Sequence, residues 1–255
     1  MLDRQAFLRP IAHRGLHDAA KGIVENTRPA FEAAVAKGYG IECDLRPAAD
    51  GTPLVFHDLA LERLTAGSGP VTDLQPACAA KLRFKAGGIT GILTFADLLA
   101  LVGGRVPIFA EIKSEWTGPD LRFLSEVARI AKLNKRALAL MSFDPAVVAA
   151  IGQLAPDIPR GIVSGSYFDE DGKGWWPDSP LTDARRQALA SLLESGQAAP
   201  SFYAYEVGAL PTAATQRVRR QGMPLLTWTV RTEHDRRMAA LHADAPIFEG
   251  YEPKS

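Results

Sequence analysis

The sequence has little cysteine and no excess of either charge. Its 255 residues include two cysteines, Cys43 and Cys78. Two cysteines are too few for a disulfide framework and too isolated for a zinc site, so we expect buried or neutral thiols in a reducing compartment. Lysine plus arginine and aspartate plus glutamate number 29 each, so the formal net charge is zero. This balance argues against a nucleic-acid partner, because binding to a polyanion needs a strongly basic surface.

Long apolar runs are also missing from the sequence. No stretch approaches the ~18 apolar residues that a membrane span requires. Residues 1–10 contain Asp3, Arg4 and Arg9 and lack the apolar core of a secretory signal. The sequence also lacks a basic amphipathic helix of the kind that binds membrane surfaces. We therefore expect a cytoplasmic protein with no stable membrane association.

Short apolar runs alternate with amphipathic helical patterns along the whole chain. The runs that favour strands are 10–13, 40–45, 107–112, 137–142, 161–164, 201–205, 224–230 and 246–249. The helical patterns are 27–37, 94–102, 119–133, 145–154, 181–194, 211–221 and 232–241. This order predicts an α/β protein, and a single (β/α)8 TIM-barrel domain over residues 1–255 fits the length best. A doubly wound open sheet is the alternative, although no glycine-rich dinucleotide fingerprint opens the first helix.

Two segments interrupt this alternation. Residues from about 48 to 92, after the second strand, are irregular and contain a strand-like piece at 53–57. Residues 167–180 are rich in Asp, Gly and Pro and contain the pair Trp175-Trp176. Long loops in compact domains are usually functional or disordered, and adjacent tryptophans argue against disorder. We expect the second segment to form a rim or lid over a pocket.

Charged residues gather at the ends of two predicted strands. Glu42 and Asp44 are two positions apart on a strand and therefore project to the same face. Glu111 and Lys113 repeat this spacing on the next strand of the barrel. Carboxylates crowded in a barrel interior call for a cation, and oxygen ligands suit a divalent ion such as Mg2+ or Ca2+. The alternative is a solvated pair at each strand mouth.

Two histidines occupy matching positions where a strand meets a loop. His13 ends the first strand and precedes Arg14, and His57 ends the piece at 53–57. A lone histidine is more often structural, but two beside a carboxylate cluster fit a general acid and a general base. Arg14 and Lys113 would supply positive charge for a substrate anion. Together these groups match the needs of phosphodiester cleavage.

With these residues in place, the sequence resembles the glycerophosphodiester phosphodiesterase family. The resemblance rests on His13-Arg14-Gly15, Glu25-Asn26-Thr27, Glu42-x-Asp44, Asp50-Gly51, His57-Asp58 with Leu61, Arg63 and Thr65, Glu111-x-Lys113, Ser142-Phe143 and Trp228-Thr229-Val230. These motifs follow the family's order and span nearly the whole chain. Two positions depart from the pattern: Arg231 stands where the family commonly has Asn, and Glu249-Gly250 closes the last strand.

The resemblance implies a TIM barrel with a small inserted segment at about 48–92. It implies one divalent cation, Mg2+ or Ca2+, held by Glu42, Asp44 and Glu111. It also implies acid–base catalysis by His13 and His57 and phosphate contact by Arg14 and Lys113. These four residues and the three cation ligands form the candidate site. The expected reaction is metal-dependent hydrolysis of a glycerophosphodiester to glycerol 3-phosphate and an alcohol.

Several points stay open at the level of sequence. The nucleophile is water or the substrate's own glycerol 2-hydroxyl, and either histidine could be the base. Trp228 either packs against the glycerol carbons or fills the barrel, and Asn26 either caps the first helix or hydrogen-bonds within the site. Phe143, Tyr205, Trp175 and Trp176 could shape the exit side that holds the leaving group.

Other functions use the same equipment. One is phospholipase D-type activity on lysophospholipids, or a cyclising lyase, with Trp175 and Trp176 as part of an apolar groove. A non-catalytic phosphate-binding barrel would be expected to lack a histidine or carboxylate, and none is lost here. A metal-dependent sugar isomerase would need carboxylates and histidines spread over more strands.

Overall fold

Eight parallel strands form a closed barrel at the centre of the molecule. The structure is a computed structural model and describes residues 2–134 and 137–253, so residues 1, 135–136 and 254–255 of the predicted domain lie outside the described residues. The strands are β1 (Ile11–Ala12), β2 (Gly40–Pro47), β4 (Ile108–Ile112), β5 (Leu138–Ser142), β6 (Arg160–Ser164), β7 (Phe202–Glu206), β8 (Leu225–Val230) and β9 (Ala245–Phe248). Their order is β1-β9-β8-β7-β6-β5-β4-β2, and the pairing of β1 with β2 closes the ring. The predicted TIM barrel is confirmed.

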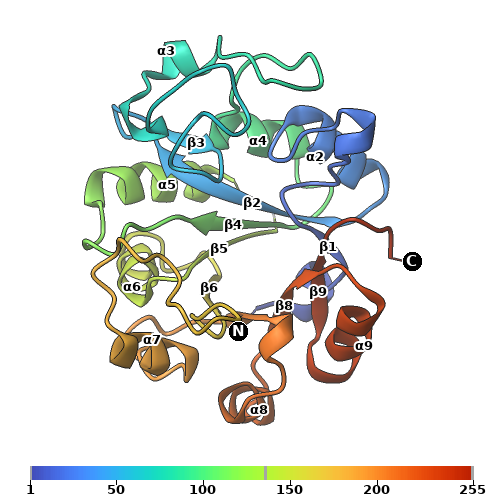
Figure 1. The fold of residues 1–255 in the computed structure, drawn as a ribbon, viewed down its shortest axis with the longest axis vertical. Helices are drawn as coiled ribbons and strands as arrows, with labels where there is room; N and C mark the ends of the chain where they lie inside the picture. Colours follow the sequence, from blue (N-terminus) through green and yellow to red (C-terminus); the bar gives the residue numbers. More distant parts are fainter. Residues whose placement is uncertain (1, 135–136, 254–255) are drawn as a thin grey trace.

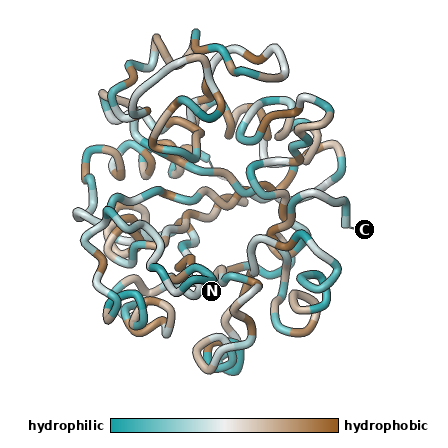
Figure 2. The backbone as a smooth tube through the Cα atoms, in the orientation of Figure 1, coloured by the Kyte–Doolittle hydropathy of each residue, from teal (hydrophilic) through white to brown (hydrophobic). Residues whose placement is uncertain are grey.

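A layer of helices surrounds this barrel (Figure 1). The helices are α2 (Arg28–Ala36), α4 (Phe95–Val102), α5 (Leu121–Leu133), α6 (Pro145–Leu154), α7 (Asp183–Ala190), α8 (Ala213–Arg220) and α9 (Glu233–His242). Each begins and ends within a few residues of its predicted pattern. Hydrophobic and hydrophilic residues alternate along their turns (Figure 2), as expected of helices with one face on the barrel. Within the described residues, no helix is long and apolar enough to cross a membrane.

A short helix that the periodicity did not predict covers the amino-terminal end of the barrel. Helix α1 (Arg4–Phe7) begins at Asp3, whose side chain accepts hydrogen bonds from the backbone N–H groups of Gln5 and Ala6. Phe7 packs edge-to-face on Phe109 of β4, and Phe109 packs in the same way on Phe202 of β7, with ring centroids 5.5 and 5.4 Å apart. These rings fill the amino-terminal end of the barrel interior. The open mouth of the barrel is therefore at the carboxyl-terminal ends of the strands.

The predicted insertion is a small unit built on β2. Strand β3 (Pro53–Val55) pairs antiparallel with β2, and two short turns of helix follow, η2 (Val71–Asp73) and α3 (Pro76–Ala79). Its core is formed by Val24, Ala48, Leu54, Phe56, Leu61, Val71, Ala79, Phe84 and Ile92. Two further 3-10 turns are η1 (Ala19–Lys21) and η3 (Val207–Ala209). Cys43 is buried as expected, whereas Cys78 of α3 is exposed.

Gly161 on β6 provides a test of the packing that closes the barrel. A Cβ at this position would lie 2.4 Å from two ring atoms of the buried Phe202. Gly161→Ala is therefore expected to destabilise the protein by about 1–3 kcal/mol through overpacking. Denaturant unfolding of both variants measures this against Gly196→Ala, a position where an added Cβ would meet no described atom within 4 Å. Equal stability of the two variants would contradict the packing argument.

Candidate active site

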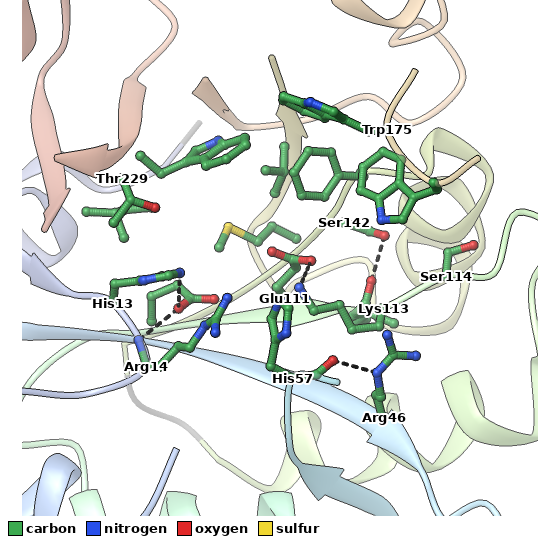
Figure 3. A pocket seen from close by; sticks show the side chains of 18 of the residues that line it. His13, Arg14, Arg46, His57, Glu111, Lys113, Ser114, Ser142, Trp175 and Thr229 are labelled. Carbon is green, nitrogen blue, oxygen red and sulfur yellow. Dashed lines mark hydrogen bonds and ion pairs between the residues drawn. The ribbon is translucent and has the colours of Figure 1, made fainter. Parts of the chain in front are cut away.

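The mouth of the barrel contains a cavity of about 410 Å3 with two unlike sides (Figure 3). One side carries charged and titratable residues, among them His13, Arg14, Glu42, His57, Glu111 and Lys113. The other side is aromatic and is formed by Trp116, Phe143, Trp175, Trp176 and Trp228. The cavity thus brings together every catalytic, phosphate-binding or metal-binding candidate except Asp44, which lies directly beneath it, buried on β2.

Three carboxylates crowd the floor of this cavity. Glu42 and Asp44 project to the same face of β2, while Cys43 between them packs into the outer core. Asp44 is in register with Glu111 on the adjacent β4. The ligand atoms of the three side chains lie within 4.8 Å of one another, and all three residues are buried. The three carboxylates to which the i,i+2 spacing drew attention therefore lie together at the mouth of the barrel.

Positive and polar groups compensate the carboxylate of Asp44. Lys113 Nζ lies 2.8 Å from Asp44 Oδ1 and 2.5 Å from Glu111 Oε1, and Arg14 Nε lies 3.4 Å from Asp44 Oδ2. Asn26 Nδ2 donates to Asp44 Oδ2 at 2.8 Å. Burial alone would raise the pKa of Asp44, but the charges of Lys113, His57 and Arg14 outweigh it and hold that pKa well below its usual range.

Glu42 is the less compensated carboxylate. Its Oε2 accepts a hydrogen bond from the backbone N–H of Arg14 at 3.0 Å. Its Oε1 is buried and accepts no hydrogen bond from any residue that the structure describes. Burial, reinforced by the charges of Asp44 and Glu111, raises the pKa of Glu42 well above its ordinary value. A buried oxygen without a donor, beside two further carboxylates, fits a hard divalent cation, so Glu42, Asp44 and Glu111 could hold one.

His13 is oriented by a carboxylate from the last strand. Its backbone N–H donates to the carbonyl oxygen of Phe248, and its Nδ1 lies 2.7 Å from Oε2 of Glu249. Its Nε2 lies 3.9 Å from Oε2 of Glu42. Burial lowers the pKa of His13, although the hydrogen bond to Glu249 opposes that effect. The hydrogen bond to Glu249 thus leaves Nε2 as the nitrogen turned towards the carboxylate cluster.

His57 has the same arrangement on the other side of the cluster. Its Nδ1 lies 2.7 Å from Oδ1 of the adjacent Asp58. Arg63 of the insertion binds both oxygens of Asp58 and both oxygens of Glu25, and Glu25 in turn accepts from Arg14 Nη1 at 2.7 Å. One guanidinium therefore links the supports of His57 and of Arg14, which explains why the insertion carries Arg63.

The structure corrects or refines several details of the sequence analysis. Asn26 hydrogen-bonds within the site, and α2 begins after Thr27, whose side chain caps no backbone N–H of the described residues. Trp228 lines the cavity, donates from Nε1 to the carbonyl oxygen of Ala204 and packs on Phe143. Trp175 and Trp176 form part of the cavity wall, as expected for that segment. Tyr205 does not line the cavity, because its side chain is buried and its hydroxyl donates to the carbonyl oxygen of Ala190.

Two supporting carboxylates were missed as parts of the site. Asp58 is adjacent to His57 in sequence, so its pairing could have been inferred from the dipeptide. Glu249 is 236 residues away from His13 and reaches it because β9 and β1 are neighbours in the closed barrel. Its position just after a strand was the available signal. His17 also lies near this carboxylate, with Nε2 3.9 Å from Oε2 of Glu249.

These features define a (β/α)8 barrel with a carboxylate cluster and two supported histidines at its carboxyl-terminal mouth. The family model described as "Glycerophosphoryl diester phosphodiesterase family" matches residues 13–248. The chain belongs to this family.

Individual relatives agree with the family. A Mycobacterium tuberculosis protein named "Probable glycerophosphodiester phosphodiesterase 1" is 30% identical over 175 residues, which span 60% of this chain and 63% of the relative. The match therefore covers less than two thirds of that protein's length. Bovine glycerophosphodiester phosphodiesterase 1 is 46% identical over 66 residues, or 25% of this chain and 19% of its own.

Solved structures share the fold. Glycerophosphodiester phosphodiesterase from Thermotoga maritima has a TM-score of 0.69 at 21% identity, covering 94% of each chain. A phosphodiesterase from Oleispira antarctica, solved with the product sn-glycerol-3-phosphate, has a TM-score of 0.73 at 18% identity, covering 94% of this chain and 93% of its own. At these identities the likeness establishes the fold.

The ion pairs of Glu249 predict a pH-dependent contribution to stability. Burial would raise its pKa, but the hydrogen bond and charge of His13 and those of Arg231 lower it to about 2, from an ordinary 4.5. A carboxylate with a depressed pKa stabilises the folded state above its unfolded pKa and loses that effect as the pH falls towards the folded pKa. Glu249→Gln is expected to lower the free energy of unfolding by roughly 1–3 kcal/mol at pH 6 and by progressively less towards pH 3.

Urea unfolding at several pH values measures this difference. Glu32→Gln, at an exposed carboxylate on α2, serves as the control and is expected to change stability little at any pH. A Glu249→Gln difference that stays constant from pH 6 to pH 3 would show that packing, rather than charge, accounts for the loss.

Proposed function

We propose that this protein is a phosphoric diester hydrolase that cleaves glycerophosphodiesters to glycerol 3-phosphate and an alcohol. The observation that carries the proposal is the placement of two histidines beside one carboxylate cluster, each with Nδ1 bound to a carboxylate. This arrangement suits proton transfer to and from a phosphodiester bound at the cluster. Membership of the family and the printed names of its relatives support the same activity.

A divalent cation is part of the proposal, with Glu42, Asp44 and Glu111 as its ligands and Mg2+ or Ca2+ as the ion. When bound, it supplies charge neutralisation at a non-bridging phosphate oxygen and at the nucleophilic hydroxyl. Arg14 and Lys113 line the same cavity and provide positive charge for the phosphate. Burial opposes the charged form of both, but the neighbouring carboxylates raise the pKa of each above its ordinary value, so both stay cationic.

The two histidines divide the proton transfers. One accepts the proton of the attacking hydroxyl, which belongs to water or to the glycerol 2-position, and the other gives a proton to the departing alkoxide. Glu249 and Asp58 accept from Nδ1–H of their histidines, so that Nε2 of each is the nitrogen that exchanges protons. Trp228, which lines the cavity on its aromatic side, would pack on the glycerol carbons.

We further propose that residues 1–255 act as one domain. The insertion is hydrogen-bonded to the barrel through the β2–β3 pair and supplies Arg63 to the supports of His57 and Arg14. It also supplies His57 itself. A unit that contributes a catalytic residue and its support is part of the active site rather than a separate module. The substrates would be water-soluble deacylated head groups of the cytoplasm, bound without a nucleic-acid partner or stable attachment to a membrane.

The primary test is release of glycerol 3-phosphate from glycerophosphoethanolamine and glycerophosphocholine. We expect release with Mg2+ or Ca2+, loss of release with a chelator, and recovery when the ion is added back. His13→Ala, His57→Ala and Glu42→Ala are expected to reduce kcat by about 10²- to 10⁴-fold each. Glu32→Ala on the surface of α2 is the matched control.

Two results would decide against this proposal. Full activity in the presence of a chelator would contradict the proposed role of the cation. No release of glycerol 3-phosphate by correctly folded wild-type protein would contradict the proposed reaction. The same assay with a lysophospholipid, followed by 31P NMR, distinguishes the alternatives. A free acylglycerol phosphate indicates phospholipase D-type activity, and a persistent cyclic phosphate indicates a lyase.

The leaving group assigns the roles of the histidines. p-Nitrophenolate needs no protonation to depart, so a glycerophospho-p-nitrophenol substrate bypasses the general acid. We expect one of the variants His13→Ala and His57→Ala to recover at least about tenfold in relative kcat on this substrate, and the other to recover little. Release of p-nitrophenolate is followed by absorbance. Equal behaviour of both variants on both substrates would contradict a division into one acid and one base.

A further inference from the structure

An aromatic wall forms the side of the cavity opposite the histidines and cations. We define it as Phe143, Trp175, Trp176 and Trp228. Phe143 packs edge-to-face on Trp176 and on Trp228, with ring centroids 5.1 and 5.4 Å apart, and Trp175 lies 6.0 Å from Trp228. Figure 3 shows Trp175 across the cavity from His13, His57 and Lys113. A phosphate held on the polar floor would therefore point its alcohol towards this wall.

The wall is held by backbone conformations that cost free energy. Trp176 has φ +51°, and two aromatic residues that pack against it, Trp116 and Tyr167, have φ +62° and +61°. Bulky side chains are disfavoured in the left-handed region, because Cβ approaches the following carbonyl oxygen too closely. Such conformations cluster at functional sites, where the surrounding structure fixes them. Three of them in one aromatic cluster indicate that its position serves a purpose beyond filling space.

The charges near the wall disfavour an anionic alcohol. Arg46 and Arg231 line the cavity outside its floor, but Arg46 is paired with Glu115 at 2.5 Å and Arg231 with Glu249 at 3.0 Å. The loop that carries Trp175 and Trp176 also carries the exposed run Asp169-Glu170-Asp171, against the single exposed cation Lys173. The two cations nearest the wall, Arg185 and Arg186, are paired with Glu194 and Asp183. The floor is therefore prepared for an anion, whereas each of these cations near the wall already has a carboxylate partner.

The ring of Trp116, which also lines the cavity, already faces a cation. The guanidinium carbon of Arg185 lies 5.6 Å from the ring centroid of Trp116. Ring faces attract cations through their quadrupole, most strongly for Trp, and the attraction grows as the cation is desolvated. A quaternary ammonium suits such a wall better than a primary one, because it has no N–H groups that require hydrogen-bond acceptors.

We propose that the aromatic wall binds a quaternary ammonium group on the leaving alcohol, so that the preferred substrates are glycerophosphodiesters of the choline type. This proposal rests on the proposed function of the same site. It assigns specificity for the alcohol to Trp175 and Trp176 and binding of the phosphate to the floor. The negatively charged phosphate of the substrate meets Arg14 and Lys113, and its positively charged ammonium group meets the wall.

A neutral isostere separates charge from shape. Glycerophosphocholine and the glycerophosphodiester of 3,3-dimethylbutanol have nearly the same shape, but only the first is cationic. We expect the wild-type protein to favour the choline ester in kcat/KM by about 3- to 30-fold, the range expected of a cation on a ring face. Trp176→Leu is expected to bring this ratio close to 1, mainly through KM for the choline ester. Trp176 is 39% exposed, so the substitution is expected to leave the fold intact.

Trp176→Phe is the matched control, because it keeps an aromatic face and should retain most of the preference. A preference that is absent in the wild type, or that survives in Trp176→Leu, would overturn the proposal while leaving the hydrolase activity established. Equal losses for both esters in Trp176→Leu would mean that the wall acts as an apolar surface.

If the wild type hydrolyses neither ester, the proposed function is contradicted, but recognition of the cation can still be tested by measuring binding of the esters. Calorimetric titration of His13→Ala with each intact ester then measures recognition of the cation directly. Tighter binding of the choline ester that is lost in the double variant with Trp176→Leu would support the wall as a cation site, and equal binding of both esters would overturn it.

Discussion

The burial of three carboxylates within 4.8 Å of one another is the constraint on which the rest of the site depends. Like charges in a poorly solvated position repel strongly, and each also loses its hydration. The protein responds unequally. Asp44 is surrounded by Lys113, Arg14 and the amide of Asn26 and keeps a low pKa, whereas Glu42, with one oxygen lacking a described donor, has a raised pKa. The site is thus built with a deficit of positive charge at Glu42.

The barrel makes this crowding possible and rigid. Register between the parallel strands β2 and β4 sets Asp44 beside Glu111, and the pleat sets Glu42 on the same face. The same closure brings Glu249, just after β9, to His13, just after β1. The insertion places His57 and Arg63 on the other side of the carboxylates. His13 is therefore oriented by Glu249 from the far end of the chain, and His57 by the adjacent Asp58 of the insertion. Hydrogen bonds through Arg14, Glu25, Arg63 and Asp58 link the two sides.

Local spacing explains what the sequence could predict and where prediction stopped. Alternation of apolar runs and helical patterns favoured the barrel over an open sheet, and the i,i+2 spacing predicted that Glu42 and Asp44 share a face, as Glu111 and Lys113 do. Both predictions depend on short-range periodicity. Helix α1 lacks enough turns for a period to be detected. The pairing of Glu249 with His13 depends on closure of the whole ring. Asn26 was ambiguous because its left-handed backbone, with φ +56°, turns its amide away from a cap and towards Asp44.

Left-handed backbone conformations connect the floor of the cavity with its wall. Of the seven non-glycine residues with positive φ in the described chain, Arg14 and Asn26 belong to the floor, and Trp116, Tyr167 and Trp176 belong to the aromatic cluster. The floor residues lie between β1 and α2, whereas the aromatic ones lie in the loops after β4 and β6. Strain at the floor supports groups that any phosphodiester needs, since every such substrate presents the same phosphate. Under the proposed function, strain at the wall would support groups that meet the alcohol. Because separate loops carry the two sets, we expect that the alcohol recognised by such a barrel can change through residues 114–120 and 165–182 while the chemistry of the floor is kept.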